Sequence, residues 1–268
     1  PAFRAIGLLS PKGVSRLASA ILRHGANLMA LLCYAEKAYR LHTALSDEHE
    51  TLNYQALFEQ SQALSFILNQ KYRLGKGQRV AFLCKNHISL VKALFAVSRL
   101  GADIYLLNAE MSPLQFQQLS GHYGFDFLIY DEELRSLFDQ SGYAGGEIPS
   151  YHDALPAVDN LSAVSANRKE RLKRTSRGNL VILTGGTTGN YKTAVHKPSA
   201  MNFLNPLVAM LTRLKLAACN TAYIAVPIYH GYGLATLFLF LSLGKKVLIS
   251  RRFNAERACE LVHRHQVE

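Results

Sequence analysis

The amino-acid sequence predicts an α/β protein whose parallel sheets are covered by helices. Segments 78–84, 103–107 and 180–183 are short and rich in apolar residues, as buried strands are. Helical patterns of about 10 to 15 residues separate such segments, and strands that alternate with helices of this length pair in parallel. The length of 268 residues is enough to bury the core of one large domain or of two small ones.

The expected elements follow one another along the chain. Apolar residues at helical spacing from Val14 to Ala35 predict a helical lead over about residues 1–42. A helix follows the N-cap residue Asn53 and continues through Leu68. The next elements are a strand at 78–84, helices at 88–100 and 113–122, strands at 103–107 and 126–130, a long loop at 140–178, strands at 180–183 and 222–226, and a final helix up to about His265.

A glycine- and hydroxyl-rich segment follows the strand at 180–183 directly, and it reads Thr184-Gly185-Gly186-Thr187-Thr188-Gly189-Asn190-Tyr191-Lys192. The glycines let the backbone come close to a ligand, while the threonine hydroxyls and Lys192 supply donors and charge for phosphate oxygens. A Walker A loop is excluded, because Tyr191 stands where that motif needs a glycine. The segment therefore predicts a phosphate-binding site of another kind, although an isolated stretch of this composition can also be a surface turn.

This segment resembles the phosphate-binding signature of the adenylate-forming superfamily, which contains acyl-CoA synthetases, peptide-synthetase adenylation domains and luciferases. The matching residues are Thr184, Gly186, Thr187, Thr188, Gly189 and Lys192. Three positions depart from the signature: Gly185, Tyr191 and Thr193 replace the usual serine, proline and glycine.

A second resemblance follows the strand at 222–226. Pro227-Ile228-Tyr229-His230-Gly231-Tyr232-Gly233 is similar to a family segment that lies beside the carboxylate pocket. His230 stands 38 residues after Lys192, which is the family spacing. Taken alone, His230 would be better explained as a loop histidine whose hydrogen bonds are satisfied.

The resemblance implies a role for each matching residue. Lys192 and His230 would be catalytic, and Thr184 would contact magnesium. The phosphates of ATP would be held by Thr184, Gly185, Gly186, Thr187, Thr188, Gly189 and Lys192, and the substrate pocket would include Tyr229, His230, Gly231, Tyr232 and Gly233. The implied cofactors and substrates are ATP, Mg²⁺, CoA and a carboxylic acid, for which a medium- or long-chain fatty acid is favoured. The implied enzyme is thus an AMP-forming acyl-CoA synthetase.

Two other functions remain open. The chain could belong to an adenylation domain that loads an amino or aryl acid onto a carrier protein. Alternatively, the departures at Gly185, Tyr191 and Thr193 could mark a homologue that binds nucleotide or acyl groups without catalysis.

The resemblance covers about residues 51–267 and implies the N-terminal subdomains of the adenylate-forming fold, truncated before later family elements. The chain alone is therefore expected to be inactive. We expect a basic amphipathic helical lead at 1–42, a first α/β subdomain at 43–178 that ends in a basic loop, and a second α/β segment at 179–268 that carries the phosphate-binding segment and is incomplete at its C-terminus.

The net charge of +11 is concentrated in two clusters. Residues 1–42 contain six Lys and Arg against Glu36, and residues 168–177 contain six against Glu170. No aromatic residue interleaves the second cluster, so we expect no nucleic-acid partner. That cluster is either a solvated loop or a patch that steers ATP or CoA. The first either packs on its own domain or makes a peripheral contact with an anionic membrane surface.

The remaining compositional features indicate a cytoplasmic protein. No apolar run approaches the roughly 18 to 20 residues of a transmembrane helix. The cysteines Cys33, Cys84, Cys219 and Cys259 are far apart, so their spacing indicates neither a zinc site nor a disulfide framework.

Overall fold

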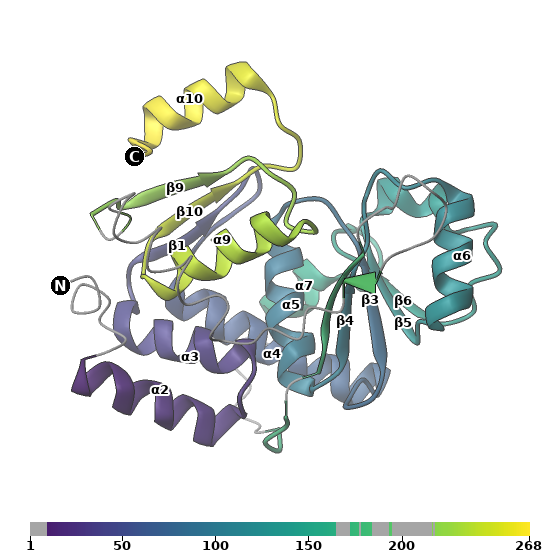
Figure 1. Cartoon of the computed structure of the whole chain (residues 1–268), viewed down its shortest axis with the longest axis horizontal. Coiled ribbons are helices and arrows are strands. Elements are labelled where there is room, and N and C mark those ends of the chain that lie inside the picture. Colours follow the sequence, from purple (N-terminus) through teal and green to yellow (C-terminus); the bar gives the residue numbers. More distant parts are fainter. Residues whose placement is uncertain (1–9, 165–171, 177, 184–192, 195–215, 217) are drawn as a thin grey trace.

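The computed structural model describes residues 10–164, 172–176, 178–183, 193–194, 216 and 218–268 (Figure 1). Its strands form two sheets. The four-stranded sheet has the order β2 (Thr51–Asn53), β1 (Thr43–Ser46), β10 (Lys246–Ile249) and β9 (Thr221–Ile224). The six-stranded sheet has the order β6 (Gly146–Pro149), β5 (Phe127–Tyr130), β3 (Arg79–Leu83), β4 (Asp103–Leu106), β7 (Leu180–Leu183) and β8 (Thr193–Ala194).

Most of these strands pair in parallel, which confirms the predicted sheet type. Only β2 and β8 run antiparallel to their described neighbours, β1 and β7. Parallel strands need long connections, and helices supply them between the described strands. The helices are α2 (Pro11–His24), α3 (Leu28–Tyr39), α4 (Tyr54–Tyr72), α5 (Ile88–Leu100), α6 (Pro113–Tyr123), α7 (Val158–Val164), α9 (Gly231–Ser242) and α10 (Ala255–His265), with a 3₁₀-helix, η2, at Glu132–Leu137.

The core lies where the two sheets face each other across helices. Figure 1 shows α5 and α9 between the sheets, with α10 on the other side of the four-stranded sheet and α6 on the far side of the six-stranded one. Every residue of α5 is buried, including Lys92, whose ammonium donates to Glu50 at 2.8 Å and to Gln60 at 3.1 Å. A helix that is apolar on all sides belongs in such a central layer, and a charge inside it needs a partner.

The structure confirms the predicted helices and strands between residues 51 and 130 within a few residues. Asn53 is the N-cap of α4, since its side chain accepts a hydrogen bond from the backbone N–H of Ala56 at 2.8 Å. The long loop predicted at 140–178 was wrong in part, because it contains β6 and α7. Sequence propensity disfavours a strand that ends in Pro149, but β6 is an edge strand of the described sheet, where a proline is tolerated.

The strand order crosses the predicted boundary between residues 178 and 179. β1 and β2 precede that boundary, yet they share a sheet with β9 and β10. Conversely, β7 follows it and pairs with β4. The division into segments 1–42, 43–178 and 179–268 stays a prediction, and it does not coincide with membership of the two sheets.

No helix within the described ranges is both long enough and apolar enough to cross a membrane. In α2, Ser10 caps the N-terminus and the side chains of Val14 and Leu22 are exposed. The peripheral membrane contact of residues 1–42 stays a prediction.

Candidate functional site

Polar residues of both sheets gather where the parallel strands end. Asn86 lies three residues after β3, while Asp131, Ser150 and Ser250 directly follow β5, β6 and β10. In open α/β sheets, ligands bind beyond the carboxyl ends of parallel strands. The described residues line a cavity of about 530 Å³ here. Its lining includes Lys85, Asn86, Glu110, Pro227, Tyr229 and Arg251.

The predicted substrate segment lies between β9 and α9. A backbone turn closes it, since the His230 N–H donates to the Pro227 carbonyl at 3.1 Å. Tyr229 is buried and lines the cavity; burial and the nearby charge of Glu110 raise the pKa of its hydroxyl. Tyr229 is therefore the predicted pocket residue that the structure places at the cavity wall.

His230 occupies the N-cap position of α9 without making a side-chain cap hydrogen bond. Its ring is exposed and packs against that of Tyr229, with 4.7 Å between the centroids. By contrast, the N-cap side chains of Asn53 and His87 both bind their helices. The imidazole of His230 is thus not used to stabilise the helix.

Gly231, Tyr232 and Gly233 form the first turn of α9 and, within the described part of the chain, do not line the cavity. The assignment of His230 and of these three residues to the substrate pocket stays a prediction.

The N-terminus of α9 lies beside β7. A Cβ atom added at Gly231 would be 3.5 Å from Cδ1 of Ile182, the residue before the last one in β7. The next residue after β7 is Thr184, and Leu183 pairs with Thr193 at the start of β8. The start of α9 thus lies beside the end of β7, the strand that directly precedes the predicted phosphate-binding segment in the sequence.

The predicted phosphate-binding residues themselves lie outside the described residues. They are Thr184, Gly185, Gly186, Thr187, Thr188, Gly189 and Lys192. Their roles stay a prediction, with β7 and β8 as the described strands that flank them.

Gly233 leaves no room for a larger residue. A Cβ atom at this position would lie 2.3 Å from the carbonyl oxygen of Pro227, far closer than van der Waals contact. Gly233→Ala should therefore destabilise the fold by roughly 1 to 3 kcal/mol, as overpacking against backbone does. Gly121, in α6, has nothing within 4 Å of such an atom, and Gly121→Ala should stabilise by roughly 0.5 to 1 kcal/mol. Urea unfolding of both variants would test whether the unfolding free energy falls in Gly233→Ala and rises in Gly121→Ala. Equal changes in the two variants would contradict this prediction.

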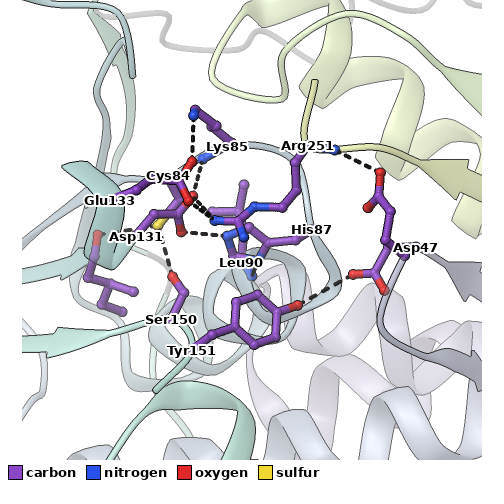
Figure 2. Close-up of polar contacts among 12 residues, drawn as sticks. Asp47, Cys84, Lys85, His87, Leu90, Asp131, Glu133, Ser150, Tyr151 and Arg251 are labelled. Atoms are coloured by element: carbon purple, nitrogen blue, oxygen red, sulfur yellow. Dashed lines mark hydrogen bonds and ion pairs between the residues drawn. The ribbon is translucent and has the colours of Figure 1, made fainter. Parts of the chain in front are cut away.

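The sequence interpretation missed a buried polar network that surrounds Asp131 (Figure 2). Asp131 accepts hydrogen bonds from Nε2 of His87 at 2.7 Å, from the backbone N–H of Lys85 at 2.9 Å and from Arg251 at 3.3 Å. Burial by itself would raise the pKa of the carboxyl, but His87, the Lys85 N–H and Arg251 outweigh burial and hold the pKa below its usual range. Asp131 is accordingly a buried carboxylate whose charge is satisfied.

The ligand atoms of Cys84, His87 and Asp131 lie within 4.8 Å of one another, a spacing that a metal ion could use. Both ring nitrogens of His87 are already engaged, since Nδ1 accepts from the Leu90 N–H at 2.9 Å and Nε2 binds Asp131. Burial also raises the pKa of the Cys84 thiol strongly, which keeps it protonated. Cys84 itself hydrogen-bonds to the Ile129 carbonyl at 3.4 Å and to the Ser150 hydroxyl at 3.2 Å, so the three side chains form a structural cluster with their neighbours.

Arg251 and Asp47 tie the two sheets together at this edge. Arg251 follows β10 and reaches across to Glu133 at 2.8 Å as well as to Asp131. Asp47, in the turn after β1, accepts from the Ile88 N–H at the start of α5 at 2.7 Å. Figure 2 shows Arg251 and Asp47 approaching the network around Asp131 and His87 from the side of the four-stranded sheet. One signal for these residues is in the sequence: Asp131 directly follows the predicted strand at 126–130, which is the buried strand β5 in the structure.

A family model described as AMP-binding enzyme matches residues 34–268. The chain belongs to this family. That membership agrees with the adenylate-forming superfamily predicted from the two motifs.

Among curated proteins, this chain is 27% identical over 226 residues to a 2-succinylbenzoate–CoA ligase of Bacillus velezensis, with 84% of this chain and 44% of that protein covered. It is 26% identical over 226 residues to the ligase of the same name from Bacillus subtilis, again covering 84% of this chain and 44% of that protein. The chain thus spans less than half the length of these relatives.

Solved structures share the fold. The O-succinylbenzoate coenzyme A synthetase (MenE) of Bacillus subtilis in complex with AMP has a TM-score of 0.70 at 24% identity, covering 88% of this chain and 59% of that chain. A putative long-chain-fatty-acid CoA ligase from Rhodopseudomonas palustris has a TM-score of 0.76 at 16% identity, covering 90% and 61%. The match confirms the predicted fold, that of the N-terminal part of these enzymes.

Proposed function

We propose that the protein containing this chain is an AMP-forming acid–CoA ligase. What supports this most is the place of the segment before α9, since Gly231 lies beside Ile182 of β7, the strand that directly precedes the predicted phosphate-binding segment in the sequence. Membership of the AMP-binding enzyme family adds to this support. The substrates are a carboxylic acid, ATP and CoA.

The reaction has two steps. In the first, a carboxylate oxygen bonds to the α-phosphorus of ATP and the bond from that phosphorus to the bridging oxygen breaks, which yields acyl adenylate and pyrophosphate. In the second, the CoA thiol bonds to the acyl carbon, loses its proton and displaces AMP. The first step brings anions together, so fixed positive charge and hydrogen-bond donors are the main catalytic requirement.

Lys192 and the neighbouring threonine hydroxyls would neutralise the departing pyrophosphate, with magnesium held in part by Thr184. Tyr229 and His230 would border the acid, with His230 near the reacting carboxylate. The imidazole of His230 makes no cap hydrogen bond to α9 and stands at the N-terminus of that helix. Both features support this role, because the end of a helix carries partial positive charge that favours an anion.

Two kinds of carboxylic acid are the first candidates for the substrate. The sequence favoured a medium- or long-chain fatty acid, whereas the curated relatives are named 2-succinylbenzoate–CoA ligases. The relatives make the aromatic keto acid the stronger choice, and a fatty acid remains the second candidate because a fatty-acid ligase has the same fold.

The test is pyrophosphate release by the full-length protein with ATP and 2-succinylbenzoate, octanoate, palmitate or an amino acid, followed by CoA addition and thioester detection. We expect acid-dependent pyrophosphate release and a CoA thioester. Release of pyrophosphate without thioester, with acyl transfer to a carrier protein instead, would support the adenylation-domain alternative. Binding of ATP without any release would support a non-catalytic homologue and contradict the proposal.

A further inference from the structure

The side chain of Asn86 joins the loop after β3 to the segment that enters α9. Its Nδ2 donates to the Val226 carbonyl at 2.9 Å, and its Oδ1 accepts from the Ile228 N–H at 2.7 Å. Only one orientation of the amide satisfies both partners, because a carbonyl only accepts and a backbone N–H only donates. Asn86 therefore binds the backbone on both sides of Pro227, which has no N–H of its own.

Asn86 is itself held firmly. The residue is 5% exposed. Its neighbours in the chain both bind the Asp131 carboxylate, Lys85 through its backbone N–H at 2.9 Å and His87 through Nε2 at 2.7 Å. A side chain whose two neighbours in the chain are both held in place can position its own partners accurately. Through the Asn86 amide, the loop after β3 thus fixes the position of the loop after β9.

The segment that Asn86 holds carries the residues that face the proposed substrate. The Pro227 carbonyl accepts the His230 N–H at 3.1 Å, and Tyr229 between them lines the cavity. We propose that Asn86 is a positioning residue for the acid-binding segment, which sets Tyr229 and His230 through Val226 and Ile228. This inference rests on the proposed function, because it gives those two residues a role at the acid.

Asn86→Ala in the full-length protein tests the role in catalysis. We expect kcat/KM for the carboxylic acid to fall roughly 10- to 100-fold, as small misplacements of binding groups cause. The KM for ATP should change less than about 3-fold, because the phosphate-binding residues lie in another segment. If Asn86 had a purely structural role, the variant would contain less folded enzyme. The apparent kcat would then fall, while the KM values for the acid and for ATP would stay unchanged.

Asn160→Ala is the matched control. Asn160 also braces a loop with its amide, accepting from the Ala157 N–H at 2.9 Å and donating to the Leu155 carbonyl at 2.9 Å. It does not line the cavity among the described residues, so its loss should leave both KM values and the exchange behaviour of the 226–230 segment unchanged.

Hydrogen exchange supplies a readout that does not depend on activity. The Ile228 amide is bound by Oδ1 of Asn86, so it should exchange faster in Asn86→Ala, whereas Asn160→Ala should have no effect there. Asn86→Asp has the same size and keeps an acceptor for Ile228, but it places a carboxylate oxygen against the Val226 carbonyl. This variant should keep Ile228 protected and still lose activity toward the acid.

The outcomes separate the two proposals. If the wild-type protein releases no pyrophosphate with any acid, the proposed function fails, while faster exchange at Ile228 in Asn86→Ala would still support the link to the α9 segment. If wild type is active and Asn86→Ala leaves kcat/KM for the acid unchanged, the positioning role is overturned. It is also overturned if the Ile228 exchange rate stays the same, or if Asn86→Ala and Asn86→Asp both fail to fold, since Asn86 would then serve stability alone.

Discussion

Replacing Lys192 by alanine should slow pyrophosphate release by about 30- to 1,000-fold, equivalent to roughly 2 to 4 kcal/mol of lost transition-state stabilisation. The reason is that Lys192 is the one charged residue within the sequence 184–192, which we propose binds the phosphates. Pyrophosphate is present only in the first half-reaction. Thioester formation from a supplied acyl adenylate should therefore be affected much less, and the two rates are measured separately on the full-length protein.

Lys173→Ala is the control for this experiment. Lys173 lies in the basic cluster that precedes the phosphate-binding segment, and its side chain is exposed. Its backbone carbonyl, which remains in the alanine variant, accepts a hydrogen bond from Arg99 at 2.9 Å. Its loss should change the rate less than about 3-fold, with the difference disappearing at high salt because exposed charges are screened. If pyrophosphate release slowed equally in Lys173→Ala and Lys192→Ala, Lys192 would contribute only to the overall positive charge of the region. Unchanged pyrophosphate release in Lys192→Ala would contradict the phosphate-binding assignment.

Asp131→Ala should lower the free energy of unfolding by about 3 to 5 kcal/mol, since removing one member of a buried charged network leaves the others unpaired. The groups left without their acceptor are Nε2 of His87, the Lys85 N–H and part of the Arg251 guanidinium. The control is Asp139→Ala, because the side chain of Asp139 is 50% exposed and pairs with Arg135 at 3.3 Å. Its loss should cost less than about 1 kcal/mol in a urea titration.

The destabilisation by Asp131→Ala should depend on pH in one direction. The pKa of Asp131 is lower in the folded protein than its ordinary value of 3.8, so its stabilising effect is present above that value and is lost as the pH falls below it. The difference in unfolding free energy between wild type and variant should be constant from about pH 7 to pH 5 and shrink below about pH 4. Buried His24, whose pKa is lowered to about 4 by burial and by Arg99, contributes to both proteins and cancels in the difference. A difference that stays constant at acidic pH would contradict the assignment of a charged Asp131.

Local patterns were sufficient for the regular elements of the first half of the chain. The N-cap Asn53 and the apolar run 88–100 predicted α4 and α5 because capping and burial of a continuous apolar segment are properties of neighbouring residues. β6 and α7 were missed because their stability comes from pairing with β5 and packing against α4, which no local pattern specifies.

The candidate site divides in the same way. The glycine- and threonine-rich segment and His230 could be found from the sequence because their residue types and order carry the chemistry. Asn86, Asp131 and Arg251 are ordinary polar residues far apart in sequence. No sequence pattern indicates that Asn86 binds residues 226 and 228, as it does in the structure.

The sequence by itself therefore determined the family, the alternation of strands and helices, and the residues proposed to handle phosphate and carboxylate, since each follows from residue types at short spacing. Only the tertiary structure decided which strands share a sheet, that the N-terminus of α9 meets the end of β7, and that Asn86 and Asp131 link the two sheets at the cavity, Asp131 through Arg251. The physical reason is that local residue patterns do not specify which segments meet. Packing of the whole chain selects contacts such as the pairing of Leu45 with Val247 and the hydrogen bond between Asn86 and Ile228, which are 142 residues apart.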